Sequence, residues 1–349
     1  MISKGIILEQ YKEPALSRDL RQFTNAATVD STFNGPLVED VQSLTGEDII
    51  EIARKAEIVD ERDGVLLYEK LRTVKKGSIT AVVADAIDDE PYISSQLNPL
   101  LQLKEDAIGG LKLAAKVLGV SSTYVAVYKN LIDLEMKIPT SVLNVPVKRI
   151  RGKYPVEFRI AESFNKEKGV LLIGVCALIH LCRAVRENRI ATTCFITVAG
   201  NCVGNPANIE VSIGMTVTQI LEHCGLIDDP TRVLVGGPMT GIAVKNTDQT
   251  IITTTTRAIL AYKDDEKEFH YSCVGCGKCV QVCPEMLTPY MIYHLTEKKQ
   301  MFRLSLYDPQ QCIGCGTCSY VCPSRLDVSG AVKRAKQYVR AERQGGADR

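Results

Sequence analysis

Eight cysteines near the C-terminal end of the chain have the clearest potential for chemistry. They form two copies of the spacing C-x2-C-x2-C-x3-C-P, which read CVGCGKCVQVCP at residues 273–284 and CIGCGTCSYVCP at residues 312–323. Three thiolates spaced two residues apart can wrap a loop around one iron–sulfur cube, while the fourth points away to a second cube. The sequence therefore predicts two [4Fe–4S] clusters, whose chemistry is the transfer of single electrons.

The fourth cysteine of each motif is expected at the start of a helix, as a ligand of the other motif's cluster. The glycines of the motifs should let the backbone curl so that its N–H groups point at the sulfurs, and the prolines should stop longer helices. The predicted ligand sets are Cys273, Cys276, Cys279 and Cys322 for one cluster and Cys312, Cys315, Cys318 and Cys283 for the other, with Gly275, Gly277, Gly314, Gly316, Pro284 and Pro323 in the supporting roles.

A pair of structural zinc sites is the alternative interpretation of these motifs. Zinc usually takes paired C-x2-C knuckles with four ligands per ion, a spacing that two complete four-cysteine motifs do not favour. The other cysteines show no ligand spacing and are interpreted as small buried hydrophobes, and the histidines are scattered. These residues are Cys176, Cys182, Cys194, Cys202 and Cys224, and His180, His223, His270 and His294.

The composition is that of an ordinary globular chain. Of 349 residues 45% are apolar, and 42 basic residues nearly balance 41 acidic ones, so no basic field exists to attract nucleic acid. The N-terminal stretch has no signal-like apolar run, and thirteen cysteines without a secretory signal indicate metal binding rather than disulfides. The apolar stretch 170–182 contains His180 and is shorter than the roughly 20 residues of a spanning helix. We expect a cytoplasmic protein, at most peripheral on the cytoplasmic membrane face.

Hydrophobic patterning predicts alternating helices and strands before the cysteine motifs. Thr45, followed by two acidic residues, predicts the cap of a helix through IIEIARKA. Strands are predicted at 79–84 and 124–128, with a helix at 100–118 between them that Gly109-Gly110 weakens. A second set comprises strands at 194–199, 209–213 and 232–235, a helix at 216–224 and a turn at 236–239.

These elements predict an α+β multidomain fold. Residues 1–45 are an unassigned N-terminal extension, and residues 46–200 are expected to form an α/β domain. Residues 201–262 are expected to form a β-grasp-like domain. Residues 263–349 hold the two-cluster module and a C-terminal helix, with the charged run at 263–268 as the linker.

The order of these domains resembles the RnfC-like electron-transport family. That family includes the RnfC-type subunits of ferredoxin:NAD oxidoreductases, cobalamin reductase of propanediol utilisation and the electron-transfer protein associated with proline reductase. Besides the cysteine motifs, the resemblance rests on DDEPYIS, DAIGGLKLAAKVLG, KYP, NPANIEVSIGMTV and VLVGGPMTG, in that order along the chain. It implies an α/β domain similar to the complex I NADH-binding flavoprotein domain, an SLBB-type β-grasp domain and a two-cluster ferredoxin domain.

The resemblance also implies FMN, which family members hold with a glycine-rich loop before the first strand. Here Asp60-Glu61-Arg62-Asp63 replaces the glycines, and only Gly64 remains. Side chains block the close approach that glycines allow, and three carboxylates repel a phosphate, of which Arg62 can offset one. We therefore predict that FMN does not bind. The retained Glu90-Pro91-Tyr92 and the turn at 236–238 are interpreted as structural.

The leading hypothesis is an electron-transfer subunit that relays single electrons between redox partner proteins, such as a flavoprotein, a ferredoxin, or a reductase or dehydratase system. It assigns no catalytic residue. The alternatives are an NADH-dependent FMN/Fe–S oxidoreductase and a redox-sensing or assembly partner. No nucleic-acid partner is expected. The basic C-terminal helix is interpreted as a solvated face, with an acidic partner or anionic lipid as the alternative; its basic residues are Lys333, Arg334, Lys336, Arg340 and Arg343.

Overall fold

The computed structural model describes residues 20–24, 31–35, 37–38, 40–74, 77–129, 138–164, 169–263 and 271–345. The chain separates into two compact units, and each is described by itself. The first comprises the described residues up to Pro238 together with Ile242–Lys263, and the second comprises Met239–Gly241 and the described residues from 271 onward. Most of the predicted linker and His270 lie outside the described residues.

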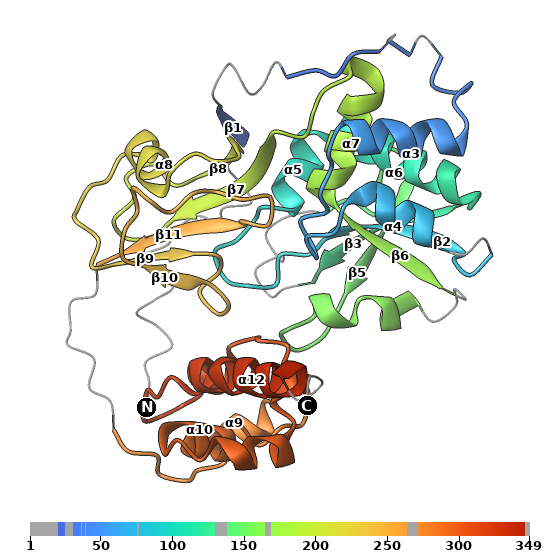
Figure 1. The fold of residues 1–349 in the computed structure, drawn as a ribbon. Coiled ribbons are helices and arrows are strands. Elements are labelled where there is room, and N and C mark those ends of the chain that lie inside the picture. The colour runs from blue at the N-terminus through green and yellow to red at the C-terminus, as the bar shows by residue number, and fades with distance from the viewer. Residues whose placement is uncertain are drawn as a thin grey trace. The chain divides into compact units, whose positions relative to one another are not determined.

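A mostly parallel five-stranded sheet forms one part of the first unit (Figure 1). The two strands predicted first pair in parallel, with Ala81 opposite Ser122. Alternate side chains point to opposite faces, so Val82 and Ala84 join one apolar cluster while Val83 joins another. The strand order is β4-β5-β3-β2-β6, with β4 antiparallel at the edge. The strands are β2 (Ala81–Ala86), β3 (Ser122–Tyr128), β4 (Ser141–Val142), β5 (Val145–Ile150) and β6 (Val170–Gly174).

Helices pack on one face of this sheet, and two short 3-10 helices pack on the other. The predicted cap at Thr45 is confirmed, because its hydroxyl accepts a hydrogen bond from the Asp48 N–H while the Asp48 carboxylate accepts one from the Thr45 N–H. The helices are α3 (Gly46–Lys55), α4 (Leu67–Thr73), α5 (Leu97–Gln102), α6 (Lys104–Leu118) and α7 (Val175–Glu187), with η3 (Glu157–Arg159) and η4 (Ala161–Phe164) on the other face.

Close contact between α6 and α7 explains the glycine pair that was expected to weaken the predicted helix. A Cβ atom on Gly110 would lie 1.9 Å from the carbonyl oxygen of Leu178, so only glycine fits at this crossing. The helix runs through both glycines without a break. The apolar stretch 170–182 divides at Gly174 into the strand β6 and the first part of the helix α7.

A six-stranded mixed sheet completes the first unit. Strands β7 and β8 form an antiparallel hairpin, α8 follows, and β11 returns parallel to β7 while pairing antiparallel with β9. This arrangement of strands around one helix is the predicted β-grasp pattern. The strand β1, in the unassigned N-terminal stretch, pairs in parallel with β8. The elements are β1 (Leu20–Phe23), β7 (Thr193–Ala199), β8 (Ala207–Ser212), α8 (Val217–Cys224), β9 (Arg232–Val235), β10 (Ile242–Val244) and β11 (Ala258–Tyr262).

One continuous hydrophobic core joins the two sheets of the first unit. Polar contacts fix α7 against the second sheet. Arg183 Nη1 lies 2.6 Å from Glu210 Oε1, and His180 Nε2 lies 2.8 Å from the Thr193 carbonyl oxygen. All four residues are buried, so each contact satisfies groups that would otherwise be costly to bury.

The second unit is small and helical. Its apolar core consists of side chains from α10, α12 and the 3-10 segment η5, among them Leu295, Leu304 and Val332. The predicted C-terminal helix at 328–343 is confirmed as α12. The elements are α9 (Lys278–Gln281), α10 (Pro289–Glu297), η5 (Met301–Tyr307), η6 (Pro309–Gln311), α11 (Thr317–Tyr320) and α12 (Val328–Gly345).

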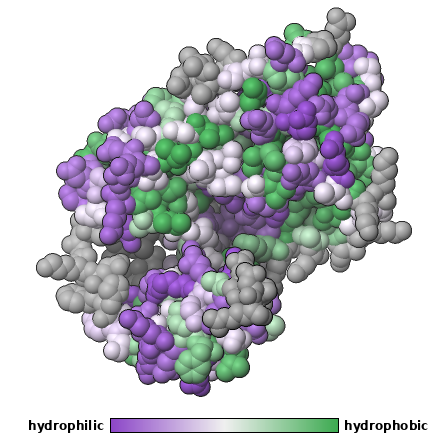
Figure 2. All heavy atoms as spheres, in the orientation of Figure 1, coloured by the Kyte–Doolittle hydropathy of each residue, from purple (hydrophilic) through white to green (hydrophobic). Residues whose placement is uncertain are grey.

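Polar and apolar side chains are interspersed over the face of the molecule shown in Figure 2. Among the described helices, none combines the length and apolar character required to cross a membrane.

We predict that Gly110→Ala lowers the stability of the first unit, although alanine favours helix by up to about 1 kcal/mol over glycine. The new methyl group would clash with the Leu178 carbonyl of α7, and overpacking of this kind costs about 2 kcal/mol or more. Amide hydrogen exchange of α6 and α7 should accelerate. Lys112→Ala, on the exposed face of the same helix, should leave exchange nearly unchanged. Equal or slower exchange in Gly110→Ala would contradict the packing argument.

Candidate iron–sulfur sites

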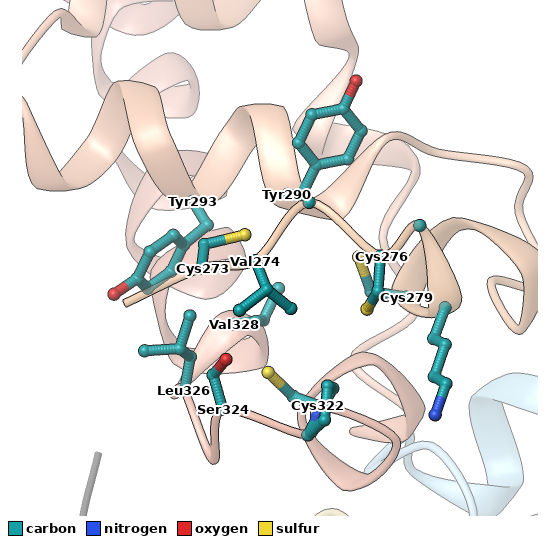
Figure 3. Close-up of a pocket in the computed structure, with 14 residues that line it drawn as sticks. Cys273, Val274, Cys276, Cys279, Tyr290, Tyr293, Cys322, Ser324, Leu326 and Val328 are labelled. Atoms are coloured by element: carbon teal, nitrogen blue, oxygen red, sulfur yellow. The ribbon is translucent and has the colours of Figure 1, made fainter. Parts of the chain in front are cut away.

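The second unit holds two pockets, each lined by four cysteines. The first is lined by Cys273, Cys276 and Cys279 of the first motif and by Cys322 of the second. Figure 3 shows the sulfur atoms of these residues turned toward a common space beside Val274 and Val328. Three sulfurs come from one loop and the fourth from a segment more than 40 residues away in the chain. The structure thus brings together the four residues predicted for one cluster.

The second pocket repeats this arrangement with the motifs exchanged. Cys312, Cys315 and Cys318 of the second motif line it together with Cys283 of the first. Apolar side chains, including Leu287 and Val332, and the backbone of Gly314 and Gly316 complete the wall. Each motif therefore supplies three cysteines to one pocket and one to the other.

A short helix in each motif produces this exchange. The helix α9 begins just before Cys279 and ends at Gln281, and α11 likewise ends at Tyr320. Our expectation that the fourth cysteine starts a helix is therefore wrong: Cys283 and Cys322 follow these helices, directly before the turn that begins at the motif's proline. Four residues of helix rise about 6 Å, which carries Cys283 away from the loop that holds Cys273 and Cys276.

The loops before these helices need a backbone that only glycine adopts readily. Gly277 and Gly316 have φ angles of +71° and +76° and cap α9 and α11. Gly275 and Gly314 are also left-handed, with φ of +65° and +75°. Residues with a side chain rarely adopt this backbone conformation. The four glycines therefore allow the loops to curve, as predicted.

Hydrogen bonds hold the two motifs side by side. The Tyr271 N–H donates to the Ser324 carbonyl at 3.2 Å, and the Ser324 hydroxyl donates to the Ser272 carbonyl at 3.0 Å. These bonds join the residues before Cys273 to those after Cys322. They explain why cysteines so distant in sequence line the same pocket.

Backbone and side-chain donors surround the sulfurs. The Leu287 N–H lies 3.3 Å from Cys283 Sγ, and the Gly314 N–H lies 3.4 Å from Cys312 Sγ. Lys336 donates to the Cys312 carbonyl at 2.5 Å, which brings a cation to the second pocket. The sequence analysis missed this role of Lys336, because helical periodicity alone placed it on a solvated face. Its exposed neighbour Arg334 pairs with Glu297 at 2.7 Å.

The thiols themselves are unfavourable places for negative charge. Burial, reinforced by the neighbouring cysteines, raises the pKa of Cys318 to about 12, and burial also raises the pKa of Cys279 and Cys312. Four thiolates in such a pocket require positive charge among them. Iron would supply this charge, and its binding must displace the thiol protons.

The donor chemistry of both pockets fits an iron–sulfur cluster: four sulfurs, drawn from two segments, with N–H groups directed at sulfur. Within the described part of the chain, no three His, Cys, Asp or Glu side chains are grouped so that they could hold a single metal ion.

The five other cysteines, His180, His223 and Glu90 lie in the first unit, whereas His294 lies on α10 of the second. The five remaining cysteines are buried, as expected of small hydrophobes. His223 stacks on Phe23 with ring centroids 4.0 Å apart. Glu90 lies against the turn at Gly237, where a Cβ atom would be 2.0 Å from its carboxylate oxygen, so the two retained family segments contact each other.

The loop that replaces the family's glycines folds back on its own unit. Lys70 Nζ lies 2.5 Å from Asp60 and 2.8 Å from Asp63, so one lysine compensates two carboxylates. The sequence predicts that Arg62 offsets one carboxylate of the loop. Instead, the Arg62 side chain forms an ion pair with Asp85 of β2 at 2.5 Å. The charged side chains of this loop are therefore held by ion pairs within the first unit.

Comparison with known families matches two parts of the chain. The SLBB domain matches residues 195–243, and the 4Fe-4S dicluster domain matches residues 272–326. The first match covers strands and the helix of the mixed sheet. The second contains all eight cysteines of the two pockets.

Curated relatives extend over most of the chain. The C subunit of the ion-translocating oxidoreductase complex of Rhodobacter capsulatus is 28% identical over 63% of this chain and 46% of the relative. The C subunit of the Na(+)-translocating ferredoxin:NAD(+) oxidoreductase complex of Acetobacterium woodii is 27% identical, over 80% of this chain and 67% of the relative. The chain thus spans about half the length of the Rhodobacter protein that it matches.

The fold has relatives among solved structures. A chain of the NAD+-reducing [NiFe]-hydrogenase in its H2-reduced state aligns with a TM-score of 0.52 over 89% of this chain and 66% of that chain, at 11% identity. The chain thus combines an α/β part, whose fold is shared with the hydrogenase chain, with parts that match an SLBB domain and a 4Fe-4S dicluster domain, in agreement with the predicted α+β multidomain fold. The chain is thus similar to the C subunits of ion-translocating oxidoreductase complexes, and both domain matches fit the RnfC-like family that the sequence resembles.

We predict that pairs of cysteine substitutions distinguish exchanged from unexchanged ligand sets. Cys276→Ala with Cys322→Ala removes two cysteines from the same pocket, so about half of the iron and acid-labile sulfide should remain. Cys276→Ala with Cys283→Ala removes one cysteine from each pocket and should abolish both clusters. The number of clusters in each variant is measured by iron and acid-labile sulfide analysis and by EPR on anaerobically purified protein.

Unexchanged ligand sets predict the reverse outcome for these two double variants. Cys224→Ser, at a buried cysteine of the first unit, serves as the control and should keep the full iron content.

Proposed function

We propose that the chain is an RnfC-like electron-transfer subunit in which two [4Fe–4S] clusters relay single electrons between redox partner proteins. The eight pocket cysteines are the proposed ligands, in the exchanged sets described above. Bound clusters would supply one-electron redox chemistry, with potentials that depend on hydrogen bonds to sulfur and on burial. The chain's own residues position the thiolates, limit solvent access and set the local charge.

The exchange of cysteines between the pockets carries this proposal. Cys279 and Cys283 are four residues apart on the segment that contains α9, yet they line different pockets. The same holds for Cys318 and Cys322 around α11. The pockets are therefore neighbours connected by short covalent segments, which suits passage of an electron from one cluster to the next. A purely structural metal site has no need of this adjacency.

The relatives give the proposal its context. Their names describe subunits of ion-translocating oxidoreductase and ferredoxin:NAD(+) oxidoreductase complexes. By analogy, we propose that this chain works beside other redox proteins, such as a ferredoxin or a flavoprotein, in a complex that is peripheral to a membrane. The first unit then serves as scaffold and docking surface.

Two rival functions lead to different observations. An NADH-dependent flavoprotein oxidoreductase would contain stoichiometric FMN and pass hydride electrons to its clusters. A redox-sensing or assembly partner would hold reducible clusters that do not exchange electrons with another protein. Two observations distinguish the relay, the flavoprotein and the sensor. They are whether NADH reduces the clusters, and whether the reduced clusters pass electrons to another protein.

We predict that anaerobically purified full-length protein is bleached by titanium(III), a one-electron reductant, but not by NADH. Mixing the reduced protein with an oxidised two-cluster ferredoxin should then transfer about two electrons per chain, one from each cluster. Stopped-flow absorbance and EPR measure both steps. The Cys276→Ala, Cys322→Ala double variant should take up about half as many electrons and transfer them more slowly, because one of the two clusters would be missing.

Rapid bleaching by NADH in protein that contains FMN would favour the flavoprotein function. Reduction without onward transfer to ferredoxin or flavodoxin would favour the sensor. Cys224→Ser should behave as the wild type in both steps, which controls for general effects of cysteine loss.

A further inference from the structure

The parallel sheet of the first unit has a topological switch point that is filled by the chain's own side chains. From β2 the chain proceeds to β3 and β5 on one side of the sheet, and β6 lies on the other side of β2. Open sheets of this kind bind ligands at the carboxyl ends of the strands where the order reverses. Here that place is between the ends of β2 and β6, which lie next to each other (Figure 1).

The helix α7 begins at this position, directly after β6. Its 13 residues follow Gly174, and its first N–H groups have no partners within the helix. In many nucleotide-binding sheets such N–H groups receive a ligand phosphate, because they donate hydrogen bonds and carry the positive end of the helix dipole.

In this protein the carboxylate of Glu61 accepts hydrogen bonds from N–H groups at the start of α7. The Cys176 N–H donates to Oε1 at 2.8 Å, and the Ala177 N–H donates to Oε2 at 3.0 Å. Glu61 is only 6% exposed, so its carboxylate is enclosed. Asp60 adds a further contact, accepting the Gly174 N–H at 3.2 Å. Two side chains of the loop thus satisfy three donor groups around the start of α7.

The fit leaves no room for another group. A Cβ atom on Gly174 would lie 2.2 Å from Glu61 Oε1, so the carboxylate lies directly on the bare backbone. On the opposite strand, Arg62 covers Asp85 at the carboxyl end of β2. Glu61 and Arg62, adjacent in the chain, therefore cover the carboxyl ends of both β6 and β2.

Burying the Glu61 carboxylate is unfavourable, and hydrogen bonds from the backbone partly compensate for its burial. Burial, with the nearby Asp60 carboxylate, raises the pKa of Glu61 to about 7, whereas hydrogen bonds from the N–H groups of Cys176 and Ala177 oppose this rise. Retaining a buried carboxylate at this cost is consistent with a specific structural role for it.

We propose that Glu61 is a built-in anion that closes the nucleotide crevice of this domain. Its carboxylate occupies the position of a ligand phosphate at the start of α7, and the loop Asp60–Asp63 takes the volume of the rest of a mononucleotide. The α/β domain therefore keeps the architecture of a flavoprotein domain without its flavin. FMN does not fit the residues present, and no step of electron transfer passes through it.

The first test measures FMN binding to the wild-type full-length protein with its clusters intact. After incubation with FMN and equilibrium dialysis, we expect far less than one FMN per chain. Stoichiometric, tightly bound FMN would overturn the proposal. This result does not depend on whether any variant folds, and it leaves the iron and sulfide content of the second unit as a separate measurement.

The second test opens the crevice with Glu61→Gly. Removing the carboxylate frees the N–H groups of Cys176 and Ala177, so inorganic phosphate should raise the melting temperature of the variant by stabilising its folded state. The wild type should show no such rise. Asp63→Ala is the matched control, because Asp63 pairs with Lys70 without contacting α7 in the described structure.

Phosphate stabilisation of Glu61→Gly alone supports the internal anion. If Glu61→Gly folds but phosphate leaves its melting temperature unchanged, or if Asp63→Ala responds equally, Glu61 does not hold a phosphate position and the proposal fails. If Glu61→Gly does not fold, the FMN measurement on the wild type decides whether the proposal stands.

Discussion

The sharing of cysteines between two loops is the constraint on which the second unit depends, because iron bound in either pocket would tie both loops together. Its apolar core comprises few side chains, such as Ile292, Leu295 and Val339, and small domains with so little core usually need metals or disulfides for stability. Cys283 and Cys322 connect each loop to the pocket of the other. Cluster binding would therefore fix the relative position of both motifs, and the same bonds that carry electrons would hold the unit together.

The first unit handles charge in a different way. It places three buried acidic groups and the exposed Asp63 at the carboxyl edge of the parallel sheet, and it compensates each one locally. Asp60 and Asp63 share Lys70, Asp85 pairs with Arg62, and Glu61 rests on the start of α7. Such a cluster would be costly to open, because removing one partner leaves a buried charge without compensation.

Sequence patterns predicted those features that depend on neighbours in the chain. Cysteine spacing predicted both pockets, and the capping residues at Thr45 and the apolar periods predicted most helices and strands. Such local patterns could not predict contacts between segments that are far apart in the sequence. Nothing near Glu61 indicates that it meets residues 174–177, and nothing near Arg62 indicates Asp85 as its partner. Gly110 seemed a weakness because the Leu178 carbonyl that requires it is far away in sequence.

The closed crevice and the paired pockets are consistent with each other. Hydride chemistry delivers electrons in pairs and needs a cofactor such as flavin to separate them, whereas iron–sulfur clusters accept one electron at a time. Under the proposal that Glu61 replaces the phosphate of such a cofactor, the domain would have no means of separating a hydride's electrons. Electrons would then reach the cysteine pockets already separated, and hydride chemistry would belong to another protein.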